Sequence, residues 1–131
     1  MSTHPATTKW IKDRKAKHIC LGCAEPALPN RLYCHSCANS NRARAQQTRA
    51  NVRSQVLAHY GNKCSHCGID DPDVLTIDHI HNNGNTHRLS NGMRVTGYKL
   101  AAEIIRASYP NTYQILCFNC NYKKHLHGGK L

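Results

Sequence analysis

The chain contains few aromatic residues, few acidic residues and no long apolar run. One Phe, one Trp and six Tyr are its aromatic side chains among 131 residues. Domains with so few large apolar side chains bury small cores and usually need disulfides or a bound metal for stability. No apolar stretch approaches the roughly 18 residues of a membrane-spanning helix, and the N-terminal Met-Ser-Thr-His-Pro lacks the apolar core of a signal peptide. We therefore expect an intracellular, cytoplasmic protein with no membrane contact.

The scarcity of acidic residues leaves a strongly basic chain. Eighteen Lys and Arg residues face seven Asp and Glu residues, which gives a formal charge of +11. Residues 1–60 carry +8 of this excess, and residues 61–131 carry +3. A charge of this size favours a polyanionic partner, and double-stranded DNA is the expected one. The alternative is a solvated basic surface with no specific partner.

All eight cysteines occur in four C-x-x-C pairs, which is the spacing of zinc ligands. Pairing in chain order is the simplest arrangement because the first two pairs close a short loop. Disulfides or an iron–sulfur cluster are the alternatives, although disulfides belong to secreted chains. The sequence therefore predicts two structural Zn²⁺ sites. Their ligands are Cys20, Cys23, Cys34 and Cys37 in the first site, and Cys64, Cys67, Cys117 and Cys120 in the second.

The pattern along the chain predicts a small zinc-stabilised α+β protein in four segments. Residues 1–17 form a basic arm, flexible or conditionally helical, and residues 18–38 form a zinc knuckle or ribbon. Residues 39–60 lack Gly and Pro and predict a basic linker helix. Residues 61–131 form the second domain, with strands over 74–80 and 113–117 and helices near 98–108 and 119–127.

The linker helix carries arginines that we expect to contact the DNA backbone. Three of them recur on one stripe of the helix, and the alternative is an ordinary solvated helix face. The arginines of this segment are Arg42, Arg44, Arg49 and Arg53.

Between and after the last two cysteine pairs lie residues with catalytic potential. Asp78 and His79 fall in the first predicted strand, and Asn121 directly follows Cys120. A zinc ion on these cysteine pairs brings the two regions together. A carboxylate, an imidazole and an amide side by side can bind a hard divalent ion and activate a water molecule. In a basic chain, a phosphodiester is the natural substrate.

These residues, within 57–126, resemble the zinc-stapled HNH endonucleases of phages and mobile introns. The resemblance rests on Asp-His between two C-x-x-C pairs and Asn after the last cysteine. It implies a ββα-metal catalytic domain over 61–131, in a homing-type enzyme working in the host cell. His79 matches the general base, and Asp78 and Asn121 match the ligands of one catalytic Mg²⁺ or Mn²⁺. Asn111 is the nearest candidate for the middle asparagine of the motif.

Several neighbouring residues are weaker candidates. On a regular strand His81 shares the face of His79, so it assists catalysis or is a bystander. His125 lies one helical turn after Asn121 and is a possible further metal ligand. We expect phosphate contacts from Arg88, Lys123 and Lys124.

Two non-enzymatic functions compete with the endonuclease. One is a zinc-dependent regulator that binds nucleic acid, and the other is a structural zinc protein that binds another protein. The intact Asp78, His79 and Asn121 favour the enzyme, because a scaffold needs only the cysteines. A homodimer is expected, since one site cuts one strand and twofold symmetry is the simplest route to two cuts.

Overall fold

A computed structural model describes residues 5–89 and 91–131, with side chains described from residue 8 onward. The chain is a small α+β protein with two clusters of four cysteines, as the sequence predicts. It divides into two compact units at Thr48 and Arg49, each of which is described separately below. Within the described residues, no helix is long and apolar enough to cross a membrane.

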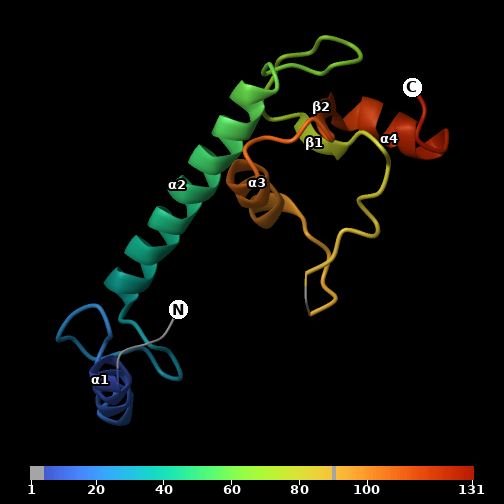
Figure 1. Ribbon diagram of the computed structural model, residues 1–131. Helices are drawn as coiled ribbons and strands as arrows, with labels where there is room; N and C mark the ends of the chain where they lie inside the picture. Colours follow the sequence, from blue (N-terminus) through green and yellow to red (C-terminus); the bar gives the residue numbers. More distant parts are fainter. Residues whose placement is uncertain (1–4, 90) are drawn as a thin grey trace. The chain divides into compact units, whose positions relative to one another are not determined.

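The first unit begins with helix α1, Pro5–Ala16 (Figure 1). The sequence predicted a flexible or conditionally helical arm over 1–17. The structure gives a helix, and residues 1–4 of that prediction lie outside the described residues. Arg14 fixes the end of α1 to the first cysteine loop, because its guanidinium donates to the carbonyls of Cys20 (3.0 Å) and Cys23.

Helix α2, His35–His59, begins four residues before the predicted start at residue 39. Cys34 explains the early start, because its sulfur accepts a hydrogen bond from the backbone N–H of Cys37 at 3.5 Å. The sulfur thus satisfies one of the N–H groups that have no partner within the first turn of a helix. At the other end, Gly61 takes a φ of +96°, a conformation that glycine adopts without strain and that commonly ends helices.

The second unit is built on a two-stranded antiparallel sheet. Strand β1 (Leu75–His79) pairs with β2 (Tyr113–Cys117), and Leu75 faces Cys117 in the register. Helix α3, Gly97–Arg106, lies in the long connection between the strands. Helix α4, Phe118–Leu126, follows β2 without a loop (Figure 1).

Two apolar clusters pack on either side of the C-terminal part of α2. Leu57 packs with three cysteines of the second cluster and with residues of the sheet, including Ile115 and Leu116. Val56 packs with α3 through Leu100 and Ile104. Val56 and Leu57, which are adjacent on α2, thus belong to different clusters. Through them the same end of α2 contacts both the two-stranded sheet and α3.

Candidate functional site

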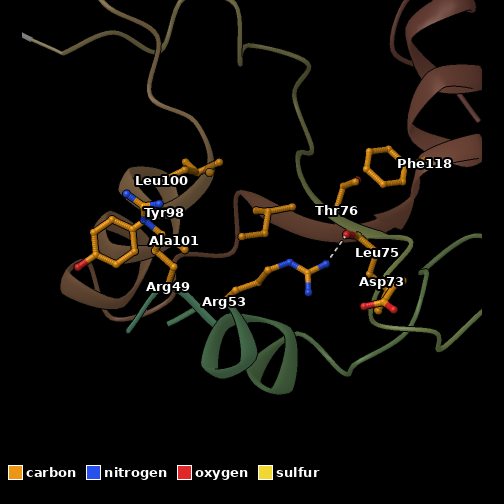
Figure 2. Close-up of a pocket in the computed structure, with 11 residues that line it drawn as sticks. Arg49, Arg53, Asp73, Leu75, Thr76, Tyr98, Leu100, Ala101 and Phe118 are labelled. Atoms are coloured by element: carbon orange, nitrogen blue, oxygen red, sulfur yellow. Dashed lines mark hydrogen bonds between the residues drawn. The ribbon is translucent and has the colours of Figure 1, made fainter. Parts of the chain in front are cut away.

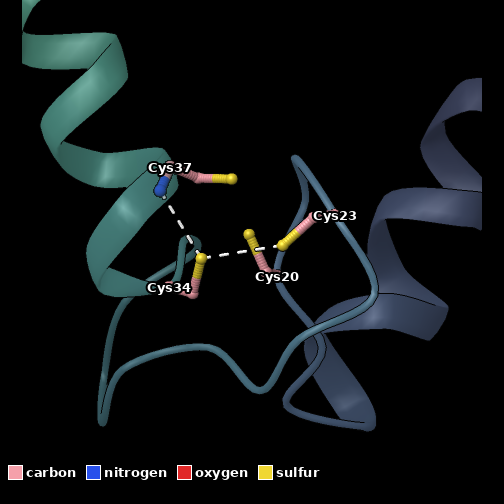
Figure 3. Close-up of side chains that lie close together, drawn as sticks. All are labelled: Cys20, Cys23, Cys34 and Cys37. Carbon is pink, nitrogen blue, oxygen red and sulfur yellow. Dashed lines mark hydrogen bonds between the residues drawn. The ribbon is translucent and has the colours of Figure 1, made fainter.

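Both cysteine quartets have the geometry of a tetrahedral metal site. In each quartet the four sulfur atoms lie within 4.8 Å of one another. Cys23 and Cys34 place their sulfurs 3.6 Å apart (Figure 3), and Cys67 and Cys117 place theirs 3.7 Å apart. Zinc–sulfur bonds of about 2.3 Å in a tetrahedron require sulfurs about 3.8 Å apart, whereas a disulfide requires about 2.05 Å. Each quartet can therefore hold one zinc ion.

The thiol pKa values within a quartet diverge because the sulfurs are close. Burial opposes ionisation of Cys64, but backbone N–H groups outweigh it and lower the pKa of this thiol to about 6. Burial and the neighbouring sulfurs raise the pKa of Cys120 to about 12. Several thiolates together are unfavourable without a cation, and a bound Zn²⁺ supplies the compensating charge.

The second unit also contains a hollow of about 390 Å³ beside β1 and α4. Asp78 and His79 reach it from β1, and Asn121 and His125 reach it from α4, one helical turn apart. The structure thus places the three residues that the sequence singled out, Asp78, His79 and Asn121, around one hollow.

Thr76 determines which end of the Asn121 amide faces the hollow. The Thr76 hydroxyl donates its single hydrogen to the carbonyl of Leu116 at 2.9 Å, so it can only accept from a second partner. Asn121 supplies that hydrogen from Nδ2 at 2.9 Å. The carbonyl oxygen Oδ1 of Asn121 is therefore the atom available to a cation.

Lys124 has a different role from the predicted phosphate contact. Its side chain is buried, and Nζ donates to Asp78 Oδ2 at 2.6 Å and to the carbonyl oxygens of His79 (2.7 Å) and Ile80 (3.1 Å). The expectation that Lys124 contacts DNA is wrong, because this ammonium is enclosed. It binds the carbonyl groups at the end of β1 and neutralises part of the Asp78 charge.

Two side-chain oxygen atoms, one on Asp78 and one on Asn121, could hold a hard cation weakly. Gln114 Nε2 also donates to Asp78 Oδ2, at 2.8 Å, so Oδ1 is the carboxylate oxygen with ligand capacity. Together with Asn121 Oδ1 it offers two oxygen ligands. Mg²⁺ commonly binds through one or two carboxylates and keeps several waters. These two oxygens are the atoms of the hollow that could hold such an ion, beside the Lys124 ammonium.

His79 takes part in a chain of hydrogen bonds that the sequence did not reveal. Its Nε2 lies 3.2 Å from Nδ1 of His87, and His87 Nε2 lies 3.1 Å from the carboxylate of Glu103 on α3. Burial lowers the pKa of His79 below its usual value, and the facing His87 lowers it further. His79 is thus favoured in the neutral form, which can accept a proton.

The other candidates lie away from the hollow. Strand β1 ends at His79, so His81 lies in an exposed turn and does not share a strand face with His79. Asn111 is exposed in the turn before β2. Asparagines 82 and 85 line the hollow instead, and the run Asn82-Asn83-Gly84-Asn85 was the signal for them. Arg88 and Lys123 are exposed.

The arginines of α2 fall into two groups. Arg42, Arg44 and Arg49 are exposed. Arg53 instead donates to the backbone carbonyls of Pro72 (2.5 Å) and Leu75 (2.8 Å), as Figure 2 shows for Leu75. Its guanidinium holds the segment that enters β1, in contrast to the phosphate contact expected from the sequence.

Comparison with protein-family models, with curated proteins and with solved structures gave no match.

Proposed function

We propose that this chain is a metal-dependent DNA endonuclease of the HNH type, with a ββα-metal site on β1, β2 and α4. It hydrolyses phosphodiester bonds with a water molecule activated by His79 and with one divalent cation. The observation that carries the proposal is the convergence of Asp78, His79 and Asn121 on one hollow, from two elements that the second cysteine quartet joins.

Each residue has a distinct task in this reaction. His79 accepts the proton of the attacking water, and its lowered pKa keeps it unprotonated at neutral pH. Asp78 and Asn121 would hold Mg²⁺ or Mn²⁺ through their Oδ1 atoms. A bound ion of this kind supplies charge neutralisation at the scissile phosphate and the departing oxygen. His125 lies at the same hollow and is placed to donate a hydrogen bond to phosphate.

The surroundings of the hollow suit a nucleic acid. Phe118 and Tyr122, which line it, are 61% and 65% exposed. Exposed aromatic rings can stack on bases or pack against sugars, and Lys123 adds an exposed positive charge beside them. The exposed arginines of α2 extend the basic character of the chain. Double-stranded DNA is accordingly the proposed partner, bound by a homodimer.

One observation favours a second function, a zinc-dependent nucleic-acid-binding regulator without catalysis. Lys124 already neutralises part of the Asp78 charge, so this carboxylate has a cationic partner without a metal ion. A regulator requires no more than the two quartets and the basic surface.

A single-turnover nicking assay on supercoiled plasmid separates the two functions. The zinc-loaded protein should nick DNA when Mg²⁺ or Mn²⁺ is added. His79→Ala should reduce the rate by about 10²–10⁴-fold, the usual contribution of a positioned general base. DNA affinity and zinc content should stay unchanged, because neither depends on this imidazole.

His66→Ala is the matched control, since His66 is an exposed histidine outside the hollow. It should cut as fast as the unmodified chain. Tight DNA binding with no nicking at any Mg²⁺ or Mn²⁺ concentration would instead identify the regulator. Nicking by His79→Ala within about threefold of the unmodified chain would contradict the assignment of His79.

A further inference from the structure

His79 is connected to α3 through one intervening ring. His87 lies between His79 and Glu103, with nitrogen–nitrogen and nitrogen–oxygen separations of 3.2 and 3.1 Å. The rings of His79 and His87 meet edge to face, with centroids 5.4 Å apart and planes at 86°. These three side chains come from β1, the long connection and α3.

The carboxylate at one end sets the direction of the hydrogen bonds. An ionised Glu103 can only accept, so His87 Nε2 carries the hydrogen of that bond. In a neutral His87, Nδ1 is then unprotonated and accepts from His79 Nε2. A neutral His79 that donates from Nε2 keeps its lone pair on Nδ1.

Gly84 lies against the Nδ1 edge of the His79 ring. A Cβ atom at Gly84 would lie 2.9 Å from His79 Nδ1 and 3.3 Å from Cε1, closer than side-chain atoms normally approach. Gly84 also lines the hollow. The absent side chain leaves the Nδ1 edge of His79 accessible from the hollow, while the Nε2 edge faces His87.

We propose that His87 and Glu103 are positioning residues that hold the His79 ring and keep its Nε2 protonated, so that Nδ1 is the nitrogen that accepts the proton of the water. This inference rests on the proposed function for the identity of the reaction. The arrangement of protons itself is independent of any activity. Partners that orient the histidine ligands of a metal ion are typically worth about 10–100-fold in activity, and we expect a similar contribution here.

The first test is a nitrogen NMR experiment on the full zinc-loaded chain with ¹⁵N-labelled histidine. At about pH 8.5, two units above the ordinary histidine pKa, the rings are neutral. The signals are assigned with His79→Gln and His87→Asn. We expect a protonated Nε2 on His79 and a coupling through the hydrogen bond between His79 Nε2 and His87 Nδ1. Protonation of His79 at Nδ1, or absence of this coupling, would overturn the proposal.

The second test is the nicking assay on variants of the two positioning residues. His87→Leu and Glu103→Ala should each cut about 10–100-fold more slowly, with DNA affinity and zinc content unchanged. His87→Asn should recover most of the loss, because its amide oxygen replaces the accepting nitrogen near its original place. A His87→Asn variant as slow as His87→Leu, or a Glu103→Ala variant as fast as the unmodified chain, would contradict the proposal.

Glu25→Ala is the control for loss of a carboxylate, because Glu25 is exposed and belongs to the first unit. It should cut at the rate of the unmodified chain. If the unmodified chain cuts no DNA, the proposed function fails, and the NMR result still decides whether His87 and Glu103 fix His79.

Discussion

The buried pair of Lys124 and Asp78 provides the sharpest test of the hollow. Their side chains are 4% and 8% exposed and their charged atoms lie 2.6 Å apart. Lys124→Met keeps the length of the side chain but leaves the carboxylate with Gln114 as its remaining described donor. Removing one partner of a buried ion pair costs about 3–5 kcal/mol. We expect a loss of this size in denaturant unfolding of the zinc-saturated protein.

The loss should depend on the charge of Asp78. In the double variant Lys124→Met with Asp78→Asn there is no uncompensated charge, so a coupling energy of about 1–3 kcal/mol should appear in the double-mutant cycle. Added Mg²⁺ or Mn²⁺ should also stabilise Lys124→Met more than the unmodified chain. An ion at 100 times its dissociation constant stabilises the folded state by about 2.7 kcal/mol.

Lys123→Met is the matched control, because Lys123 is an exposed lysine one position away on the same helix. It should change the unfolding free energy by less than about 0.5 kcal/mol. If Lys124→Met behaves like this control and shows no larger response to Mg²⁺, the enclosed ion pair is wrong, and so is the orientation of Asp78 toward the hollow.

Three further predictions concern the metal content, the pH dependence and the basic helix. The purified protein should contain two zinc ions per chain by elemental analysis and lose its helical circular dichroism when they are removed; one zinc, or a fold retained after complete removal, would contradict this. The single-turnover nicking rate should rise with pH through the His79 pKa and then level off, because the protonated ring cannot accept a proton, and the midpoint should lie below the ordinary 6.5, because burial lowers the pKa of His79; a midpoint above 6.5 would contradict this. Replacing Arg42, Arg44 and Arg49 with Ala should reduce the slope of log affinity against log salt by about 0.9 for each phosphate group that the variant no longer neutralises. An unchanged slope in this triple variant would mean that these arginines do not contact DNA. Arg53→Ala should mainly lower stability, since Arg53 is hydrogen-bonded to the segment before β1.

The regular elements were predictable from local patterns. The sequence predicted β2 with its observed bounds and β1 to within one residue at each end. Alternating apolar positions between turn residues carry that signal. The sequence does not predict the early start of α2 because the cap is a cysteine, which is not among the residues that usually cap helices.

The residues that contact Asp78 and His79 are harder to predict from the sequence. His87 and Glu103 approach each other only through the packing of α3, and no sequence spacing predicts this contact. The burial of Lys124 does have a signal in the sequence. Cys117, Cys120 and Lys124 follow an i, i+3, i+7 pattern, which places the lysine on the buried face of α4 with the zinc ligands. Asn121 and His125 occupy the neighbouring face and meet the hollow.

The second cysteine quartet joins the two elements that line the hollow, the sheet and α4. Cys117 is the last residue of β2 and also the N-cap of α4, where its sulfur accepts the N–H of Cys120 at 3.5 Å. Through the register of the sheet and the first turn of α4, it places Asp78 and Asn121 together. Removal of the zinc ion that this quartet can hold should therefore abolish any activity, although the zinc takes no part in the proposed reaction. A strong chelator removes both kinds of metal and cannot tell them apart. Gel filtration into buffer without Mg²⁺ removes only the weakly held ion, which is checked by measuring the zinc content afterwards. Activity that returns when Mg²⁺ alone is added assigns catalysis to the hollow. Activity that needs no added Mg²⁺ or Mn²⁺ contradicts this assignment.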